Sequence, residues 1–264
     1  MPGRPENEQN SANECKRACE QERAGAQDPA YPQGASSAQG LASEQGLAGK
    51  LWRLVAKNRR LVILAVCAVV FVALLEDVLE GDLSRIDSAA RAIIVERLRA
   101  DWLTPIMESI SALATPVSLV VLLLVIVAFA PGKRPGACAA ANLVLVFLLN
   151  QALKFIIQRP RPEGFQLAAE QGFSFPSGHS MVAMAFFGLL MWVVWRYERD
   201  RATRIGCCIA FGAVIVLVGV SRIYLGVHYA SDVVAGFCVS LAWLAVYTRV
   251  VAPLFLGPAP PSEC

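Results

Sequence analysis

Long apolar runs alternate with shorter polar segments along most of this chain. The runs fall at about residues 59–79, 110–130, 137–157, 179–195, 204–221 and 231–252. Each is close to the ~20 residues that an α-helix needs to cross the hydrocarbon core of a bilayer. Because that core has no water to bind backbone N–H and C=O groups, we expect helices, which satisfy those groups internally. The pattern predicts an all-α, polytopic membrane protein with a bundle of six transmembrane helices.

The segment 83–99, between the first two runs, has apolar residues at helical spacing with charged residues between them. The apolar positions are Leu83, Ile86, Ala90, Ile93, Ile94 and Leu98. This segment is too polar to span a bilayer, so it is predicted to form a helix in the membrane interface. It is either a surface connector or a rim that guides lipid toward a site, and we favour the connector.

The ends of the chain differ from the apolar centre. Residues 1–48 are rich in Glu, Gln, Ser, Ala, Gly and Pro and have no periodic apolar face, a composition typical of disorder. They also lack the short apolar core of a cleavable signal peptide. We therefore expect a disordered cytoplasmic tail over 1–48, a six-span membrane domain over 49–255, and a short C-terminal tail over 256–264.

Composition and charge support a membrane protein and suggest its orientation. Hydrophobic residues make up 56% of the 264 residues, well above the share in a soluble domain. The net charge of only +3 gives no reason to expect nucleic-acid binding. One side of the membrane carries the cationic positions Lys50, Arg53, Lys57, Arg59, Arg60, Lys133, Arg134, Arg196, Arg199, Arg201 and Arg204. The positive-inside rule makes that side cytoplasmic, with both termini there, in a multi-pass protein of the cell membrane.

A group of charged and titratable residues is predicted to lie on the opposite, extracytoplasmic side. Each is at or near the end or the start of an apolar run. The residues are Lys154, Arg161, His179, Arg222, His228 and Asp232. Because successive spans alternate in direction, the end of one run and the start of the next lie on the same face. A single interfacial cation or histidine is commonly a membrane anchor. The chain has only two histidines, and their joint occurrence with these charged groups favours a functional site.

The two histidines predict a nucleophile and a proton donor. His228 and Asp232 are four residues apart at the start of a run, where one helical face would let the carboxylate orient the imidazole. That pair is typical of a nucleophile with an orienting partner. His179 follows Pro176-Ser177-Gly178 and opens a run, where it could protonate a leaving oxygen.

The remaining residues of this group predict a site for phosphate. Lys154, Arg161 and Arg222 provide fixed positive charge for a phosphoryl group in its transition state. Ser177 and Gly178 are small enough for backbone amides at a helix N-terminus to approach phosphate oxygens. Because the chain supplies its own cations, neither a metal ion nor another cofactor is predicted.

The spacing of these residues resembles the signature of the type 2 phosphatidic acid phosphatase superfamily. Lys154, Arg161 and Pro162 match its first motif, Pro176 to His179 its second, and Ser221, Arg222, His228 and Asp232 its third. Arg159 and Pro160 are out of register with the first motif and are interpreted as accessory. The resemblance implies that His228 is phosphorylated, that Asp232 orients it, and that His179 is the general acid. It also implies phosphate binding by Lys154, Arg161, Ser177, Gly178 and Arg222, without a metal ion.

The leading hypothesis is an integral membrane phosphatase that acts on a lipid phosphate or polyprenyl diphosphate at the outer face through a phosphohistidine. A lipid phosphotransferase with the same site is an alternative. A lipid or anion transporter is a weaker one, because a permeating anion needs charges along the depth of the bilayer and these lie at one surface. The sequence leaves open which lipid is the substrate and what the oligomeric state is.

Overall fold

The structure, a computed structural model, describes residues 57–81, 84–129, 132–162, 164, 166–168 and 170–257. Regular structure in these ranges is helical. The helices are α3 (Arg59–Glu80), α4 (Arg85–Ala90), the π-helical η1 (Arg91–Val95), α5 (Thr104–Ala112), α6 (Pro116–Phe129), α7 (Arg134–Ile157), α8 (Gly178–Tyr197), α9 (Arg201–Tyr224), α10 (Ala230–Val250) and α11 (Ala252–Leu256). The predicted tail 1–48 and residues 258–264 lie outside the described part, and the proposed domain boundaries stay predictions.

The predicted all-α membrane fold is confirmed. Within the described ranges, α3, α7, α8, α9 and α10 are each long and apolar enough to cross a bilayer. The pair α5 and α6 passes the same criterion together, with a bend of 54° between them, and would make a sixth span. The number of spans is therefore five or six, depending on how this bent pair is counted.

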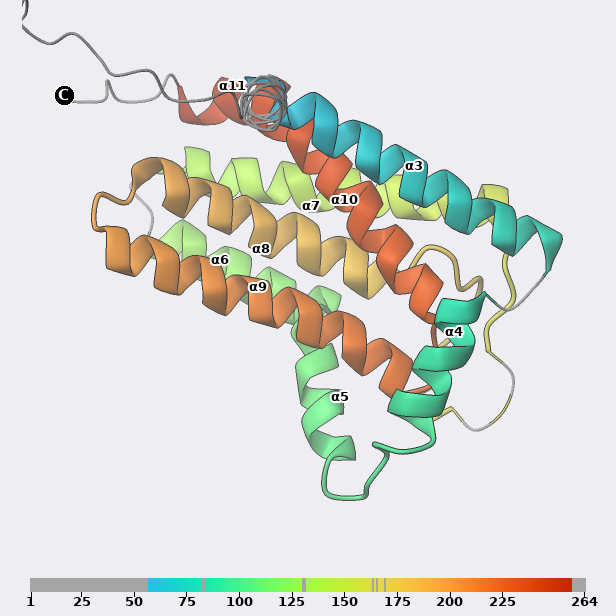
Figure 1. The fold of residues 1–264 in the computed structure, drawn as a ribbon. Coiled ribbons are helices and arrows are strands. Elements are labelled where there is room, and N and C mark those ends of the chain that lie inside the picture. Colours follow the sequence, from blue (N-terminus) through green and yellow to red (C-terminus); the bar gives the residue numbers. More distant parts are fainter. Residues whose placement is uncertain are drawn as a thin grey trace, which may run out of the picture. The chain divides into compact units, whose positions relative to one another are not determined.

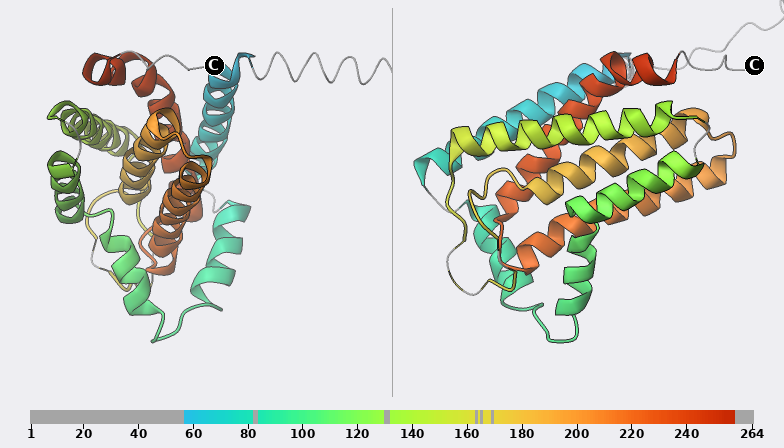
Figure 2. Two further views of the ribbon diagram at one scale, coloured as in Figure 1. Left: turned by 90° about the vertical axis from the view of Figure 1, so that its left-hand side faces the viewer. Right: turned by 180° about the vertical axis from the view of Figure 1, so that it is seen from behind.

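Helix α8 lies at the centre of the bundle. It packs against α7, α9 and α10, while α3 lies on the outer side of α10 and α6 packs against α7 (Figures 1 and 2). Gly188 allows close packing between α8 and α10, because a Cβ at this position would lie 2.6 Å from the Cδ1 atom of Leu244, and that side chain would have to move. Lipid is as apolar as the helices themselves, so such tight van der Waals contact is a main source of association between spans.

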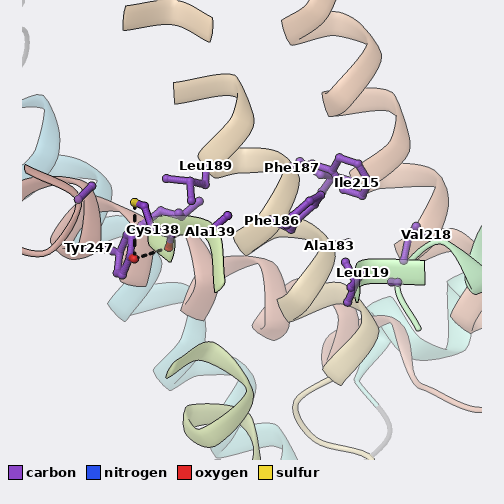
Figure 3. Close-up of a cluster of buried hydrophobic side chains, with 13 residues drawn as sticks. Leu119, Cys138, Ala139, Ala183, Phe186, Phe187, Leu189, Ile215, Val218 and Tyr247 are labelled. Carbon is purple, nitrogen blue, oxygen red and sulfur yellow. Dashed lines mark hydrogen bonds between the residues drawn. The ribbon is translucent and has the colours of Figure 1, made fainter. Parts of the chain in front are cut away.

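A cluster of buried apolar side chains joins α6, α7, α8, α9 and α10. It includes Leu119, Cys138, Ala139, Ala183, Phe186, Phe187, Leu189, Ile215, Val218 and Tyr247 (Figure 3). The rings of Phe186 and Phe187 meet edge to face with centroids 5.3 Å apart, a favoured aromatic geometry. The hydroxyl of Tyr247 donates to the carbonyl oxygen of Cys138 at 2.6 Å, so the polar end of this ring is satisfied inside the apolar cluster.

The second predicted span differs from its prediction. A single helix over 110–130 was expected, but α5 begins at Thr104 and stops at Ala112, and α6 starts only at Pro116. Pro116 has no N–H to donate to the carbonyl of Ala112, and its ring disfavours a helical conformation at Thr115. The break therefore follows from local sequence, and it lets α5 turn away from α6 and pack against α9.

The predicted helix between the first two spans is present, as α4 and η1 over residues 85–95, and it ends before the predicted residue 99. Ser84 caps it, because its hydroxyl oxygen accepts the backbone N–H of Asp87 at 3.2 Å. This helix packs against the start of α10 and, through η1, against α9 (Figure 1). The simple surface connector that we favoured is wrong in one respect, since Asp87 is buried and bonds into the bundle.

Candidate active site

His228 lies in the turn between α9 and α10, one residue before the N-cap Tyr229. We expected it on the first turn of the helix, but α10 begins at Ala230. The expected pairing is nevertheless present, with 3.3 Å between the Nδ1 atom of His228 and the Oδ2 atom of Asp232. Asp232 is fully buried, and the same oxygen accepts the backbone N–H of Tyr229 at 2.9 Å. The Nε2 atom of His228 is therefore the ring nitrogen that does not face this carboxylate.

The surroundings of His228 favour its neutral form. Burial lowers the pKa of His228 to about 4, although the hydrogen bond and charge of Asp232 act in the opposite direction. The positive charges of Arg222 and Arg161 lower the pKa further. A neutral imidazole has a free electron pair on one nitrogen, so His228 is available as a nucleophile near pH 7.

Arg161 faces the reactive side of this imidazole. Its Nη1 atom is 3.4 Å from the Nε2 atom of His228 and donates to the carbonyl oxygen of Val227 at 3.0 Å. Its Nε and Nη2 atoms donate to the carbonyl oxygens of Gly172 and Gln171, both at 3.0 Å. Backbone carbonyls on two loops thus fix the direction of the guanidinium group.

Arg222 and Arg161 both interact with the carboxylate of Glu170, a residue that the sequence motifs did not indicate. The Nη2 atom of Arg222 donates to Oε1 of Glu170, and the Nη2 atom of Arg161 lies 3.5 Å from Oε2 of the same carboxylate. Burial alone would raise the pKa of Glu170, but Arg222, His179 and Arg161 outweigh it and hold this pKa below its usual value. An ionised carboxylate therefore bridges the two arginines that we expected to bind phosphate.

Helix α5, which turns away from α6, helps to hold the side chain of Arg222 in place. Ser111, near the end of α5, accepts a hydrogen bond from the Nη1 atom of Arg222 at 2.6 Å. The hydroxyl is buried, and it lies 111 positions before its partner in the chain. No local pattern could have indicated this contact.

Lys154 and His179 complete the group of charged residues. Lys154 is in the last turn of α7 and lies within electrostatic range of Arg161 and Glu170. His179 is the second residue of α8 and lies within electrostatic range of His228 and Glu170. The fold thus brings both histidines and the three predicted cations to one end of the bundle.

The small residues before His179 are in close packing. The backbone N–H of Ser177 donates to the carbonyl oxygen of Asp232 at 3.0 Å, so in this structure it joins α8 to α10. A Cβ at Gly178 would lie 3.0 Å from the Oδ1 atom of Asn150 on α7. The N–H groups in the first turn of α8 have no acceptor within the helix, which is the arrangement that suits an anion.

Arg159 has a larger structural role than the accessory one we assigned. Its Nη1 atom donates to Oδ1 of Asp232 and to the hydroxyl of Ser231, both at 2.7 Å. Its Nη2 atom donates to Oδ2 of Asp87 on α4 at 3.1 Å. The side chain is 8% exposed. Its partners lie more than 70 residues away in the chain, beyond the reach of any spacing rule.

Comparison with known proteins identifies the family. The PAP2 superfamily model matches residues 135–255. The phosphatidylglycerophosphatase B of Bacillus subtilis (strain 168) is 36% identical over 150 residues, which cover 54% of this chain and 73% of that protein. The chain belongs to the PAP2 superfamily. It is a membrane-embedded lipid phosphatase of that superfamily, as the resemblance in its three motifs predicted.

This PAP2 phosphatase is also similar to other phosphatases and to two solved structures. The lipid A 1-phosphatase of Rhizobium johnstonii is 33% identical over 126 residues, which cover 44% of this chain and about half, 47%, of that protein. A crystal structure of a transmembrane PAP2 type phosphatidylglycerolphosphate phosphatase from Bacillus subtilis superposes with a TM-score of 0.62 at 27% identity. It covers 75% of this chain and 98% of that one. Aquifex aeolicus LpxE shares the fold, with a TM-score of 0.51 at 22% identity over 62% of this chain and 96% of that one.

A cavity of about 400 Å³ in this PAP2 phosphatase opens beside His228, between α4, η1 and the turn before α10. Its lining combines the apolar Val95 and Ile223 with two arginines and two carboxylates, which are Arg91, Arg99, Asp87 and Glu96. Among the described residues, no group of three or more His, Cys, Asp or Glu side chains is arranged to hold a metal ion.

Proposed function

We propose that this protein removes phosphate from a lipid phosphate or lipid diphosphate through a phosphohistidine on His228. The single observation that carries the proposal is the orientation of this ring. Its Nδ1 atom faces the buried carboxylate of Asp232, and its Nε2 atom faces the side where Arg161 and Arg222 hold an anion. A phosphoryl group in the place of the Glu170 carboxylate would lie beside this nitrogen.

The first step transfers the phosphoryl group to the enzyme. The lone pair on Nε2 of His228 attacks phosphorus while the bond from phosphorus to the lipid oxygen breaks. The leaving oxygen takes the bonding electrons and a proton from His179. Arg161, Arg222 and Lys154 balance the charge on the three phosphoryl oxygens, and fixed charges of this kind contribute strongly to catalysis because they need no reorganisation as the reaction proceeds.

The second step returns the enzyme to its starting state. His179, now neutral, removes a proton from water, and the water oxygen attacks phosphorus as the phosphorus–nitrogen bond breaks. Inorganic phosphate leaves and His228 recovers its lone pair. Asp232 stabilises the positive charge that the ring of His228 carries between the two steps, as a carboxylate partner does for other catalytic imidazoles.

The site is proposed to face the outside of the cell membrane, with both termini cytoplasmic. The described cations of the opposite end, including Lys57, Lys133 and Arg201, flank the other ends of the same helices. An excess of Lys and Arg in short loops marks the cytoplasmic side. A site at the outer end would meet lipid headgroups of the outer leaflet.

Phosphatidylglycerophosphate is the first substrate to test, because a similar protein and a similar crystal structure, both from Bacillus subtilis, are named for that activity. The cavity beside His228 has apolar, cationic and anionic side chains in its walls, which suits a headgroup with both hydroxyl and phosphodiester groups. Phosphatidate, diacylglycerol diphosphate and a polyprenyl diphosphate form the comparison panel.

The decisive experiment replaces His228 and follows phosphate. Purified protein is mixed with a lipid that carries ³²P in its terminal phosphate, and label on protein and in inorganic phosphate is measured at short times. We expect wild type to show transient, acid-labile label and His228→Asn to show neither label nor turnover. Turnover in His228→Asn at a tenth of the wild-type rate or more would refute the proposed nucleophile.

A second variant and a second product assay sharpen this test. His179→Gln should slow both formation and breakdown of the labelled protein, because it removes the proposed acid and base. An acceptor lipid added to wild type separates hydrolysis from transfer. Label that moves to the acceptor instead of water would make the enzyme a phosphotransferase.

A further inference from the structure

Asp232, Arg159, Ser231 and Asp87 form one continuous set of buried polar groups behind His228, which we name the Arg159 network. Asp232 and Ser231 are fully buried, and Asp87 is 3% exposed. Asp87 accepts the backbone N–H of Ser231 at its Oδ1 atom and the hydroxyl of Ser231 at its Oδ2 atom, both at 2.7 Å. The network links α4, the segment after α7 and the start of α10.

We propose that Arg159 and Asp87 are positioning residues for catalysis, which fix the carboxylate of Asp232 and through it the reactive ring of His228. The proposal rests on the proposed function, since it assumes that His228 is the nucleophile. It makes the helix α4, which the sequence suggested to be a connector, a part of the catalytic machinery.

The hydrogen bonds of Asp232 show why Arg159 controls its orientation. Its Oδ2 atom has two donors, the backbone N–H of Tyr229 and the Nδ1 atom of His228. Its Oδ1 atom has Arg159. The two donors on Oδ2 already favour one orientation of the carboxylate, and a charged donor on Oδ1 adds a further restraint against rotation about the Cβ–Cγ bond. Oδ2 then points at His228 before substrate arrives.

Arg159 is itself held on three sides. Nη1 and Nη2 bind different carboxylates, and the guanidinium plane lies 4.0 Å from the centroid of the Tyr229 ring. Lysine could supply the charge but has no planar set of donors that reaches Asp232, Ser231 and Asp87 together. The geometry thus depends on arginine in particular.

Asp87 fixes the other end of the network. Ser231 is in the first turn of α10, where backbone N–H groups have no acceptor within the helix. By accepting the N–H of Ser231, Asp87 caps α10 from another helix and holds the turn that carries His228. It also gives the buried guanidinium of Arg159 a second carboxylate partner, so that Nη1 and Nη2 both have a charged acceptor.

The charge of the network also suits the reaction. Two ionised carboxylates and one guanidinium leave one negative charge behind a ring that becomes positive when Nε2 binds phosphorus. That charge stabilises the phosphorylated state more than the free neutral imidazole. The effect belongs to the chemical step and not to substrate binding, so it should appear in kcat.

The test uses Arg159→Lys and Asp87→Asn in the full-length protein. We expect the rate of phosphoprotein formation and kcat to fall about tenfold to a hundredfold. This is the range observed in metal sites when a residue that orients a histidine is removed. KM and inhibition by vanadate should stay within about threefold, because Arg161 and Arg222 are unchanged. Arg85→Lys and Asp101→Asn are matched controls at exposed positions in the same region and should leave kcat unchanged.

The pH profile supplies a readout that loss of packing would not give. Asp232, Arg161, Arg222 and, behind them, the Arg159 network face His228. Arg159→Gln removes a positive charge, which favours protonated His228 and should move the acidic limb of kcat/KM to higher pH. Asp87→Asn removes a negative charge and should move it to lower pH.

Two results would overturn the proposal. One is phosphoprotein formation within twofold of wild type in both Arg159→Lys and Asp87→Asn. The other is a variant that loses kcat and vanadate inhibition together and that no longer elutes as a monodisperse species on size-exclusion chromatography. In that case the residues would be structural only. If wild type forms no phosphoprotein, the proposed function fails first. If wild type forms it and the variants match its rate, only the positioning role fails.

Discussion

The two ends of the bundle use arginine in different ways. At the end expected to be cytoplasmic, Arg199 and Arg201 are exposed, and Arg204 lies over the ring of Trp195 at 4.7 Å. At the other end Arg159 and Arg222 are buried and bind carboxylates. An exposed charge keeps its hydration, whereas a buried one loses several kcal/mol of hydration free energy, and a charged partner is needed to offset that loss. Burial therefore separates charges that set topology from charges that can serve chemistry.

Removal of a buried arginine should have the largest effect on catalysis. Arg222→Ala leaves Glu170 and the incoming phosphate without their shared partner, so we expect kcat/KM to fall about 100-fold to 1000-fold. Arg222→Lys keeps the charge and should recover part of the loss. Steady-state phosphate release measures both. A fall of less than threefold in Arg222→Ala would remove Arg222 from the phosphate site.

The pH dependence should show that the buried end controls a nearby nucleophile. In the proposed mechanism neutral His228 is the reactive form, and burial lowers its pKa to about 4. The acidic limb on which His228 takes up a proton should therefore lie near pH 4, and the rate should fall about tenfold per pH unit below it. Single-turnover rates across a pH series measure this limb. A limb at the ordinary histidine value of ~6.5 would contradict the effect of burial.

Glu170→Gln should moderately strengthen inhibition by inorganic phosphate. The carboxylate competes with phosphate for Arg161 and Arg222, and the neutral amide competes less. We expect inorganic phosphate to inhibit the variant several-fold more strongly, because two charge-assisted hydrogen bonds become available to it. Glu108→Gln, at an exposed position on α5, is the matched control. Weaker inhibition by phosphate would mean that Glu170 helps to build the site instead of occupying it.

Removal of exposed arginines should have the smallest effect. The double variant Arg199→Gln/Arg201→Gln lies at the far end of α9, a helix of 24 residues and thus roughly 36 Å long. Exposed charges at that distance are screened by salt. We expect kcat and KM within about twofold of wild type in the phosphate-release assay. A tenfold change would show that the two ends are coupled.

Much of this arrangement could be predicted from the sequence, and the reason is periodicity. Runs of about twenty apolar residues can only be helices in a bilayer, and alternating direction brings Lys154, His179, Arg222 and His228 to one end. The break before Pro116 is also present in the sequence, as a residue that cannot donate to the preceding turn. A continuous span was predicted there because the apolar pattern continues across the proline.

What the tertiary structure decided is the partner of each charge. Arg159 and Arg161 are two residues apart in a segment with no helical period, yet one reaches Asp87 and Asp232 while the other faces His228 and Glu170. Side-chain direction in such a segment depends on which acceptors the packed helices present. The sequence by itself determined the helices, their common end and the residues proposed to react. Only the packing of distant elements determined which arginine faces Glu170 and which one holds the aspartate behind His228.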